Sequence, residues 1–172
     1  MSSIEYKVHY APLPALGTDV LKIIEDNFVT VMTYAFSQKA LGEFCTKRYS
    51  KGTFKFLNRA FFETPQRKAT RALIELALTY RALDDAQDIS SAFSDDSSFG
   101  RLHKSNNTIG ELPLRELINK IIHSDKIEWV FEDHLDDPLI ICYASKNQVS
   151  RFKWIKAEVP ASSLADACCG FF

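Results

Sequence analysis

The sequence predicts an α+β fold, in which a helical bundle is followed by a short antiparallel β-meander. Apolar residues recur every three to four positions through the first two thirds of the chain, as in amphipathic helices. After His123 the period changes to the alternation that is typical of strands. We expect a single domain over residues 1–172. Its helical part spans about 18–125, the meander about 126–159, and a short C-terminal helix about 162–169.

The N-terminal third is predicted to contain a strand and a long helix. Residues 4–10 alternate apolar and polar side chains, which is the period of a half-buried strand that can join the meander. The residues Thr18 and Asp19 are typical of a helix start, with a capping hydroxyl followed by an acid in the first turn. The helix is expected to reach about Tyr49, with a core-facing stripe formed by Val20, Ile24, Phe28, Val31 and Ala35.

Two further helices are predicted on either side of an irregular segment. Thr64 followed by Pro65 is typical of a helix start, and the buried side of that helix consists of Ala69, Leu73, Leu76, Tyr80 and Leu83. Residues 91–111 show no apolar period and are predicted to form an irregular loop, either functional or disordered. Pro113 opens a compact amphipathic helix whose buried arc consists of Leu114, Leu117, Ile118, Ile121 and Ile122.

Three strands are predicted within residues 126–159. Residues 127–131 alternate apolar and polar side chains, and the unbroken apolar run 139–143 suits a central strand. Residues 149–159 are rich in aromatic and β-branched side chains, which predicts the third strand. The inward face of this strand changes at Trp154-Ile155, so we expect a β-bulge there.

The composition argues against a membrane or secreted protein. The first residues lack the basic start and apolar run of a signal peptide, and no apolar run approaches the roughly 18 residues that cross a bilayer. The four cysteines, Cys45, Cys142, Cys168 and Cys169, show no metal or disulfide-framework spacing. We therefore expect a cytoplasmic protein with reduced thiols. No cofactor or metal is expected, because no glycine-rich phosphate loop or paired-His zinc spacing is present.

The helix that begins at Pro113 carries the candidate catalytic residues. Arg115, Asn119 and His123 lie four positions apart, so they share one ridge that borders the apolar arc. An Arg can bind a phosphate, an amide can position a hydroxyl, and a His can transfer a proton near neutral pH. The alternative interpretation is a polar helix edge at the boundary of the core.

The stretch from Asn119 to His123 resembles the signature of the HEPN superfamily. Asn119 and His123 match the polar position and the His of that motif, whereas Ile118 stands where the family has an Arg. The resemblance covers about residues 18–125 and implies a helical bundle that binds RNA or a nucleotide. It also implies a homodimer, and a ribonuclease site that is weakened or lost without the Arg. Arg115, the nearest substitute, lies about 12 Å along the helix from His123, so a composite site requires two chains.

The segment 47–71 is strongly basic, with eight Lys and Arg residues against Glu63 alone. The candidate nucleic-acid-binding residues in its first half are Lys47, Arg48, Lys51, Lys55 and Arg59. Aromatic residues are interleaved with them, and the combination of positive charge and stacking rings suits single-stranded nucleic acid. The alternative is a solvated basic face above buried rings.

The residues from Asp84 to Asp88 fit the aspartate-rich pattern by which isoprenoid synthases hold magnesium. Arg81 can instead pair with Asp84 or Asp85 on the same helix, and we therefore expect no metal site. The leading hypothesis is a HEPN-like domain that binds RNA or a nucleotide, with any ribonuclease activity weakened or lost. The competing hypothesis is a non-catalytic interaction or oligomerisation protein whose Phe-rich surface contacts a partner or a second copy.

Overall fold

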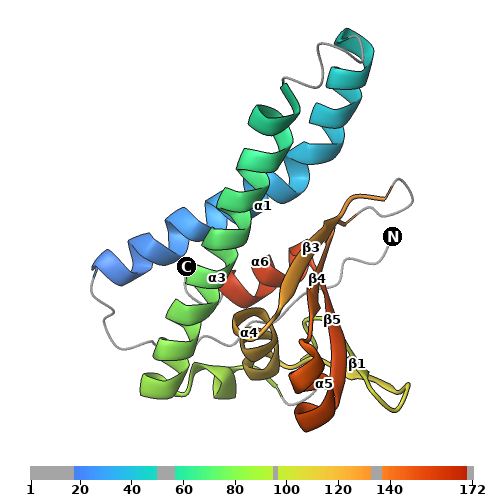
Figure 1. Ribbon diagram of the computed structural model, residues 1–172. Coiled ribbons are helices and arrows are strands. Elements are labelled where there is room, and N and C mark those ends of the chain that lie inside the picture. Colours follow the sequence, from blue (N-terminus) through green and yellow to red (C-terminus); the bar gives the residue numbers. More distant parts are fainter. Residues whose placement is uncertain (1–17, 50–56, 95–96, 133–136, 170–172) are drawn as a thin grey trace, which may run out of the picture.

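The computed structural model describes residues 18–49, 57–94, 97–132 and 137–169. The strand expected at 4–10 lies outside these residues. The α+β prediction is confirmed, because helices pack on one face of a five-stranded antiparallel sheet (Figure 1). The strand order is β2-β1-β5-β4-β3.

Two long helices, α1 (Thr18–Arg48) and α3 (Thr64–Gln87), pack against each other and form most of the helical layer. The apolar stripes predicted for both helices supply their buried residues, among them Ile24, Val31 and Leu73. The C-terminal half of α1 and the N-terminal half of α3 project together beyond the sheet (Figure 1). This projection carries part of the basic segment away from the core.

The predicted helix start at Thr64 is confirmed, because α3 begins at Thr64 with Pro65 in its first turn, but the predicted capping role of the Thr64 side chain is wrong. A π-helical turn at Arg59–Glu63 (η1) runs directly into α3, and Thr64 itself has helical backbone angles and caps nothing. Its amide donates to the carbonyl of Arg59, five residues earlier. Pro65 has no amide hydrogen and disturbs the regular ladder just after this turn, and a π turn is a common response to such a disturbance.

The irregular loop predicted at 91–111 is also wrong, because this segment contains a β-hairpin. After a 3₁₀ turn at Ile89–Ala92, β1 (Arg101–Lys104) and β2 (Ile109–Glu111) pair antiparallel. Asn107 adopts the left-handed conformation (φ 61°) in the connecting turn. Gly100 is required where the chain reaches the sheet, since an added Cβ would lie 2.2 Å from the carbonyl oxygen of Glu158.

The predicted meander is confirmed for β3 (Lys126–Val130), β4 (Leu139–Tyr143) and β5 (Trp154–Pro160), with β4 in the middle. The third strand starts later than predicted, because Lys146–Phe152 forms helix α5. Ser145 and Gln148 form a reciprocal capping box that starts this helix. The predicted bulge is confirmed, since the pairing of β1 with β5 skips Ile155.

Two short helices complete the layer over the sheet. The helix α4 (Leu114–Ile122) packs on α3, and α6 (Ala161–Cys169) contacts α1 and β5. The buried face of the sheet contributes to the same core, with Leu102, Trp129, Ile140, Cys142, Ala157 and Val159. No helix in the described ranges is long and apolar enough to span a bilayer.

Candidate functional site

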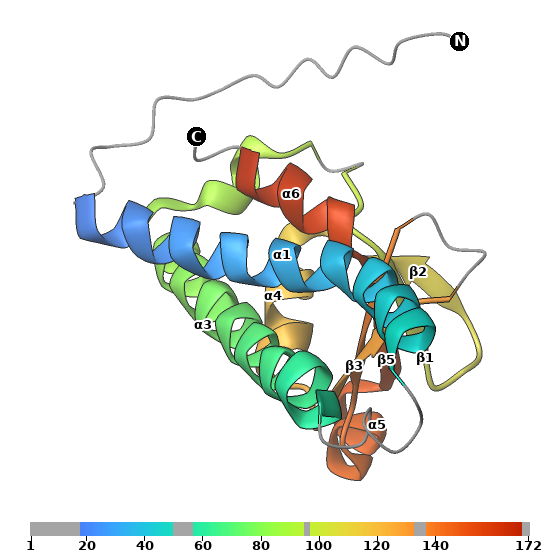
Figure 2. The ribbon, with the colours of Figure 1, turned by 90° about the horizontal axis from the view of Figure 1, so that it is seen from above.

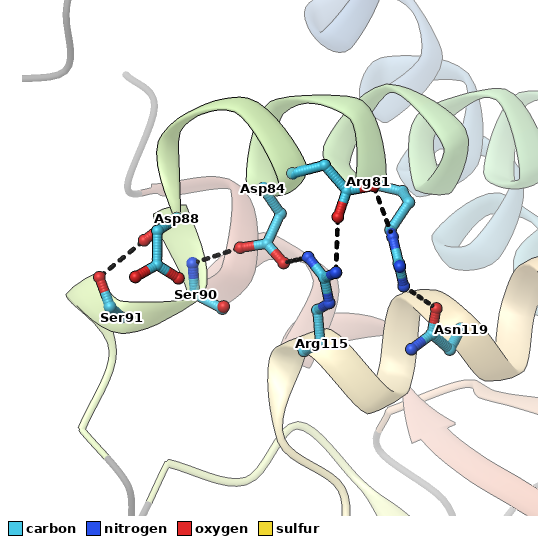
Figure 3. A network of polar contacts seen from close by, with 8 residues as sticks. Arg81, Asp84, Asp88, Ser90, Ser91, Arg115 and Asn119 are labelled. Atoms are coloured by element: carbon cyan, nitrogen blue, oxygen red, sulfur yellow. Dashed lines mark hydrogen bonds and ion pairs between the residues drawn. The ribbon is translucent and has the colours of Figure 1, made fainter.

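Two of the three predicted ridge residues belong to a polar network between α3 and α4 (Figure 3). The guanidinium of Arg115 donates to the carboxylates of both Asp84 and Asp85. Asp85 also pairs with Arg81 at 3.0 Å, as the spacing on α3 predicted. Arg81 in turn donates to the side-chain oxygen of Asn119. The network therefore ties the C-terminal end of α3 to α4 through four charged groups and one amide.

Asp84 is the buried centre of this network, with no exposed side-chain surface. Burial by itself raises the pKa of this carboxyl. Hydrogen bonds from Arg115 and from the amide of Ser90, at 2.7 Å, outweigh burial and lower the pKa below its ordinary value. The carboxylate thus stays ionised near neutral pH, because Oδ1 accepts from the amide of Ser90 and Oδ2 accepts from the guanidinium of Arg115.

His123 lies apart from the network at the C-terminal end of α4. Its side chain is exposed, and its backbone carbonyl accepts a hydrogen bond from the side-chain amide of Gln148. Its own amide donates to the carbonyl of Asn119 at 3.0 Å. The three ridge residues therefore differ in their surroundings: Arg115 and Asn119 are held by α3, while the imidazole of His123 faces solvent.

The aspartate-rich pattern does not converge on one point. Asp84 and Asp85 bind Arg115, whereas Asp88 is exposed and ends α3 in the left-handed conformation (φ 52°). Among the described residues, no group of three or more His, Cys, Asp and Glu side chains is placed to hold a metal ion. The geometry of Asp84 and Asp85 is explained by Arg115, Arg81 and the amide of Ser90.

The predicted nucleic-acid-binding residues that are described lie on the projection of α1 and α3, which we call the basic arm (residues 39–49 and 57–71). Lys47, Arg48 and Arg59 are exposed there, while Lys51 and Lys55 lie outside the described residues. The basic arm carries seven Lys and Arg residues and two Glu residues. Within the described ranges, four of these cations form no ion pair: Arg48, Arg59, Arg67 and Lys68.

An aromatic hollow of about 570 Å³ opens where the basic arm meets the end of β3. Its rings come from all three elements that meet there: Tyr34 on α1, Phe62 on η1, Trp129 on β3, and Phe131 just after β3. Tyr34 holds Trp129 and Phe131 in edge-to-face contacts, with ring centroids 4.9 and 5.8 Å apart. Lys39 and Lys47 lie on its rim. A second hollow of about 670 Å³ adjoins it at Gln66 and is lined by Arg67.

Two polar groups in the aromatic hollow lack hydrogen-bond partners within the described part of the chain. Gln38 is only 6% exposed as a whole, and no hydrogen bond of its side-chain amide with another described residue is found; its oxygen and nitrogen are not among the buried polar atoms, so they reach the hollow. The hydroxyl of Tyr34 is likewise without a partner there, and burial raises the pKa of Tyr34 to about 12, which keeps the hydroxyl protonated. Because these polar atoms are accessible from the hollow, the amide and the hydroxyl are available to a ligand.

Sequence reasoning missed most of the aromatic hollow. Tyr34 and Trp129 were expected only as members of a helix and a strand, and Gln38 was not singled out. One signal was present: Gln38 continues the apolar stripe of α1 from Val31 and Ala35, where an amide is out of place. A polar residue on the core-facing stripe of a helix indicates either a buried hydrogen bond or a ligand-binding site.

Comparisons of the chain with protein-family models, curated proteins and solved structures find no match. The resemblance to the HEPN superfamily therefore stays a prediction, together with the activities and the dimer that it implies. The candidate site rests on the geometry of this chain.

Proposed function

We propose that this domain binds single-stranded RNA, with bases in the aromatic hollow and phosphates on the basic arm. The observation that carries the proposal is the open amide of Gln38 beside the rings of Tyr34, Trp129 and Phe131. A base offers a flat face for stacking and an edge of donors and acceptors, which matches this set of groups. A free nucleotide could use the same contacts, with fewer phosphates.

The charges around the aromatic hollow support the same proposal. Arg48, Arg59, Arg67 and Lys68 form no ion pair within the described ranges, so their charge is available to a phosphate backbone. Glu43 and Glu63 are the only carboxylates of the basic arm. Neutralisation of phosphates by such side chains supplies most of the sequence-independent affinity for nucleic acid.

The proposed role is binding rather than hydrolysis. A ribonuclease site on α4 would need Arg115 to bind a phosphate, and its guanidinium already contacts Asp84 and Asp85. Asn119 likewise has a partner in Arg81. We also propose a cytoplasmic location, which is supported by the buried, unoxidised thiols of Cys45 and Cys142.

The test is a fluorescence-anisotropy titration of a labelled oligouridine with the variant R59A/R67A/K68A. Loss of three phosphate contacts should weaken binding and reduce the slope of log K against log salt by about 2, at about 0.7 per contact on a single strand. The matched control is K104A/K146A/R151A, which removes the same charge from exposed positions on β1 and α5, away from the basic arm.

If the two triple variants lose the same RNA affinity, the loss reflects the net charge of the protein and not a site on the basic arm, and the proposal is overturned. The proposal would also be overturned if the unmodified protein did not bind the labelled oligouridine at low salt. Cleavage of the labelled RNA by the unmodified protein, abolished by H123A, would replace the binding proposal with the nuclease hypothesis.

A further inference from the structure

One face of α1 is exposed and mostly apolar over about half of the helix, from Val29 to Phe44. Val29, Phe36 and Phe44 are 53%, 51% and 52% exposed, and Thr33 and Ala40 lie between them on the same side. These five residues, which we call the outer strip, extend about 22 Å at 1.5 Å per residue. The core-facing side of α1 is opposite, where the helix contacts α3 and α6 (Figure 2). Phe36 and Phe44 leave two half-exposed rings on this face, and the ring of Phe44 contacts Tyr49 edge-to-face at 6.0 Å. A row of apolar side chains along one helix face is a candidate for contact with a partner.

The charges along α1 are divided between its two halves. Residues 18–32 carry three acids and one base, whereas residues 34–48 carry three bases and one acid. Two copies of α1 that pack antiparallel would therefore place an acidic half against a basic half at both ends. Parallel packing would place like charges together. The helix dipoles also oppose each other favourably only in the antiparallel arrangement.

We propose that a second copy of this chain covers the outer strip, in a two-fold antiparallel contact of α1 with α1. A two-fold contact requires a self-complementary surface. With the axis between Phe36 and Ser37, Val29 of each copy faces Phe44 of the other, and Thr33 faces Ala40. The same register sets Asp26 against Lys47, whose contact with Glu43 within the chain is a loose 3.8 Å.

This proposal does not rest on the proposed RNA binding. The outer strip faces away from the core, while the aromatic hollow is lined by other residues of α1, including Tyr34 and Gln38. The outer strip and the lining of the aromatic hollow have no residue in common, although Lys47 on the rim of the hollow lies three positions after Phe44. The experiment must therefore use residues besides Lys47.

The test is the mass of the full chain by sedimentation velocity and light scattering at tens of micromolar protein. F36E places two carboxylates next to the two-fold axis and should weaken association by about tenfold or more, because like charges facing each other oppose binding. The matched control is I109E, since Ile109 is 60% exposed on β2, which is an edge strand of the sheet. Circular dichroism checks that both variants are folded.

A charge exchange tests the register. D26K and K47D should each weaken the dimer, because each creates a like-charge pair across the axis, and D26K/K47D should restore it. A dimer that is unaffected by F36E, or a double variant no better than either single variant, would overturn the proposal. A monomeric unmodified protein would also overturn it, and the outer strip would then contact a different partner.

Discussion

At the C-terminal end of α3, Asp84 and Asp85 contact Arg115, and Arg81 reaches Asn119. At the N-terminal end of the same helix, the cations that follow Thr64 extend into solvent, and no ion pair involving Arg67 or Lys68 is found within the described ranges. Both ends are rich in charge, yet only the first uses that charge to join two helices. Charged residues that satisfy one another stabilise a fold, whereas charged residues left open are available to a ligand.

The same contrast applies to neutral polar groups. Asn119 has a partner, and its amide would have to break that contact before it could bind a substrate. Gln38 is more deeply buried and has none in the described part of the chain. An amide that is accessible from an aromatic hollow and has no partner in the described part of the chain is available for hydrogen bonds with a ligand.

The largest expected effect is on stability at the α3–α4 network. Asp84→Ala should lower the free energy of unfolding by roughly 2–4 kcal/mol, because hydrogen bonds to charged groups contribute about 1.5–3 kcal/mol each. Asp84 accepts one such bond from the amide of Ser90 and one from the guanidinium of Arg115. Urea denaturation measures this change. RNA affinity should be unchanged, and a loss of affinity in a folded variant would contradict the structural role of the network.

The network also predicts how stability depends on pH. The pKa of Asp84 in the folded protein lies below its ordinary value of 3.8, so its contribution is fully present above that value. As the pH falls further, towards the folded pKa, the contribution is lost. Asp84→Ala should therefore show a shallower loss of stability in acid than the unmodified protein. Parallel curves for the two proteins would mean that the carboxyl is not held ionised by Arg115.

The next effect is on affinity at the aromatic hollow. Phe131→Ala should weaken binding of an oligouridine by about 1–3 kcal/mol, the usual contribution of one stacked base, which is about five- to 150-fold in Kd. Phe131→Leu keeps apolar bulk but removes the ring, and it should lose nearly as much. Phe152→Ala is the control, because this 69% exposed ring lies on α5. Equal affinity of all three variants would exclude stacking on Phe131.

A smaller effect is expected at Gln38, on affinity rather than on stability. Gln38→Met removes the amide and keeps the length of the side chain, so it should change the free energy of unfolding by less than about 1 kcal/mol. The same change should weaken RNA binding, because the amide no longer reads the edge of a base. Thermal melts and titrations measure the two effects on one sample. A destabilised variant with full affinity would show that Gln38 serves the fold and not the site.

The smallest expected effect is at His123. Its imidazole is exposed, so His123→Ala should change the free energy of unfolding by less than about 0.5 kcal/mol. Under the proposed function, RNA affinity is also unchanged. Affinity that falls while stability holds would move the site from the basic arm to the ridge on α4 and would favour the HEPN interpretation.

Much of the fold could be predicted because the main elements carry their own periodicity. The stripes of α1 and α3 repeat over many turns, and β4 was predicted with the bounds that it has. The hairpin of β1 and β2 escaped prediction because its strands have only four and three residues, of which Leu102 alone is buried. Helix α5 was missed because a strand-like composition concealed the capping box at Ser145.

The candidate site was harder to predict, since it depends on contacts between distant residues. The polar ridge was visible, but the partners of Arg115 and Asn119 lie 31 and 38 positions earlier in the chain. The basic segment was visible as well, because its eight Lys and Arg residues lie within a single stretch of the sequence, residues 47–71. The aromatic hollow was not, because Tyr34, Phe62 and Trp129 meet only when three separate elements pack together.

The π-helical turn before Pro65 has a consequence for how the basic arm tolerates change in chain length. A π turn holds one residue more than an α turn closed at the same place, and each residue of an α-helix rotates the chain by about 100°. Deletion of one residue within Arg59–Glu63 would convert the turn to regular helix. The residues that precede the deletion would then be rotated by about 100° around the axis of α3. Phe62 would then leave the wall that it shares with Gln66. Homologous chains should accordingly keep the number of residues in this turn even where the residue types differ.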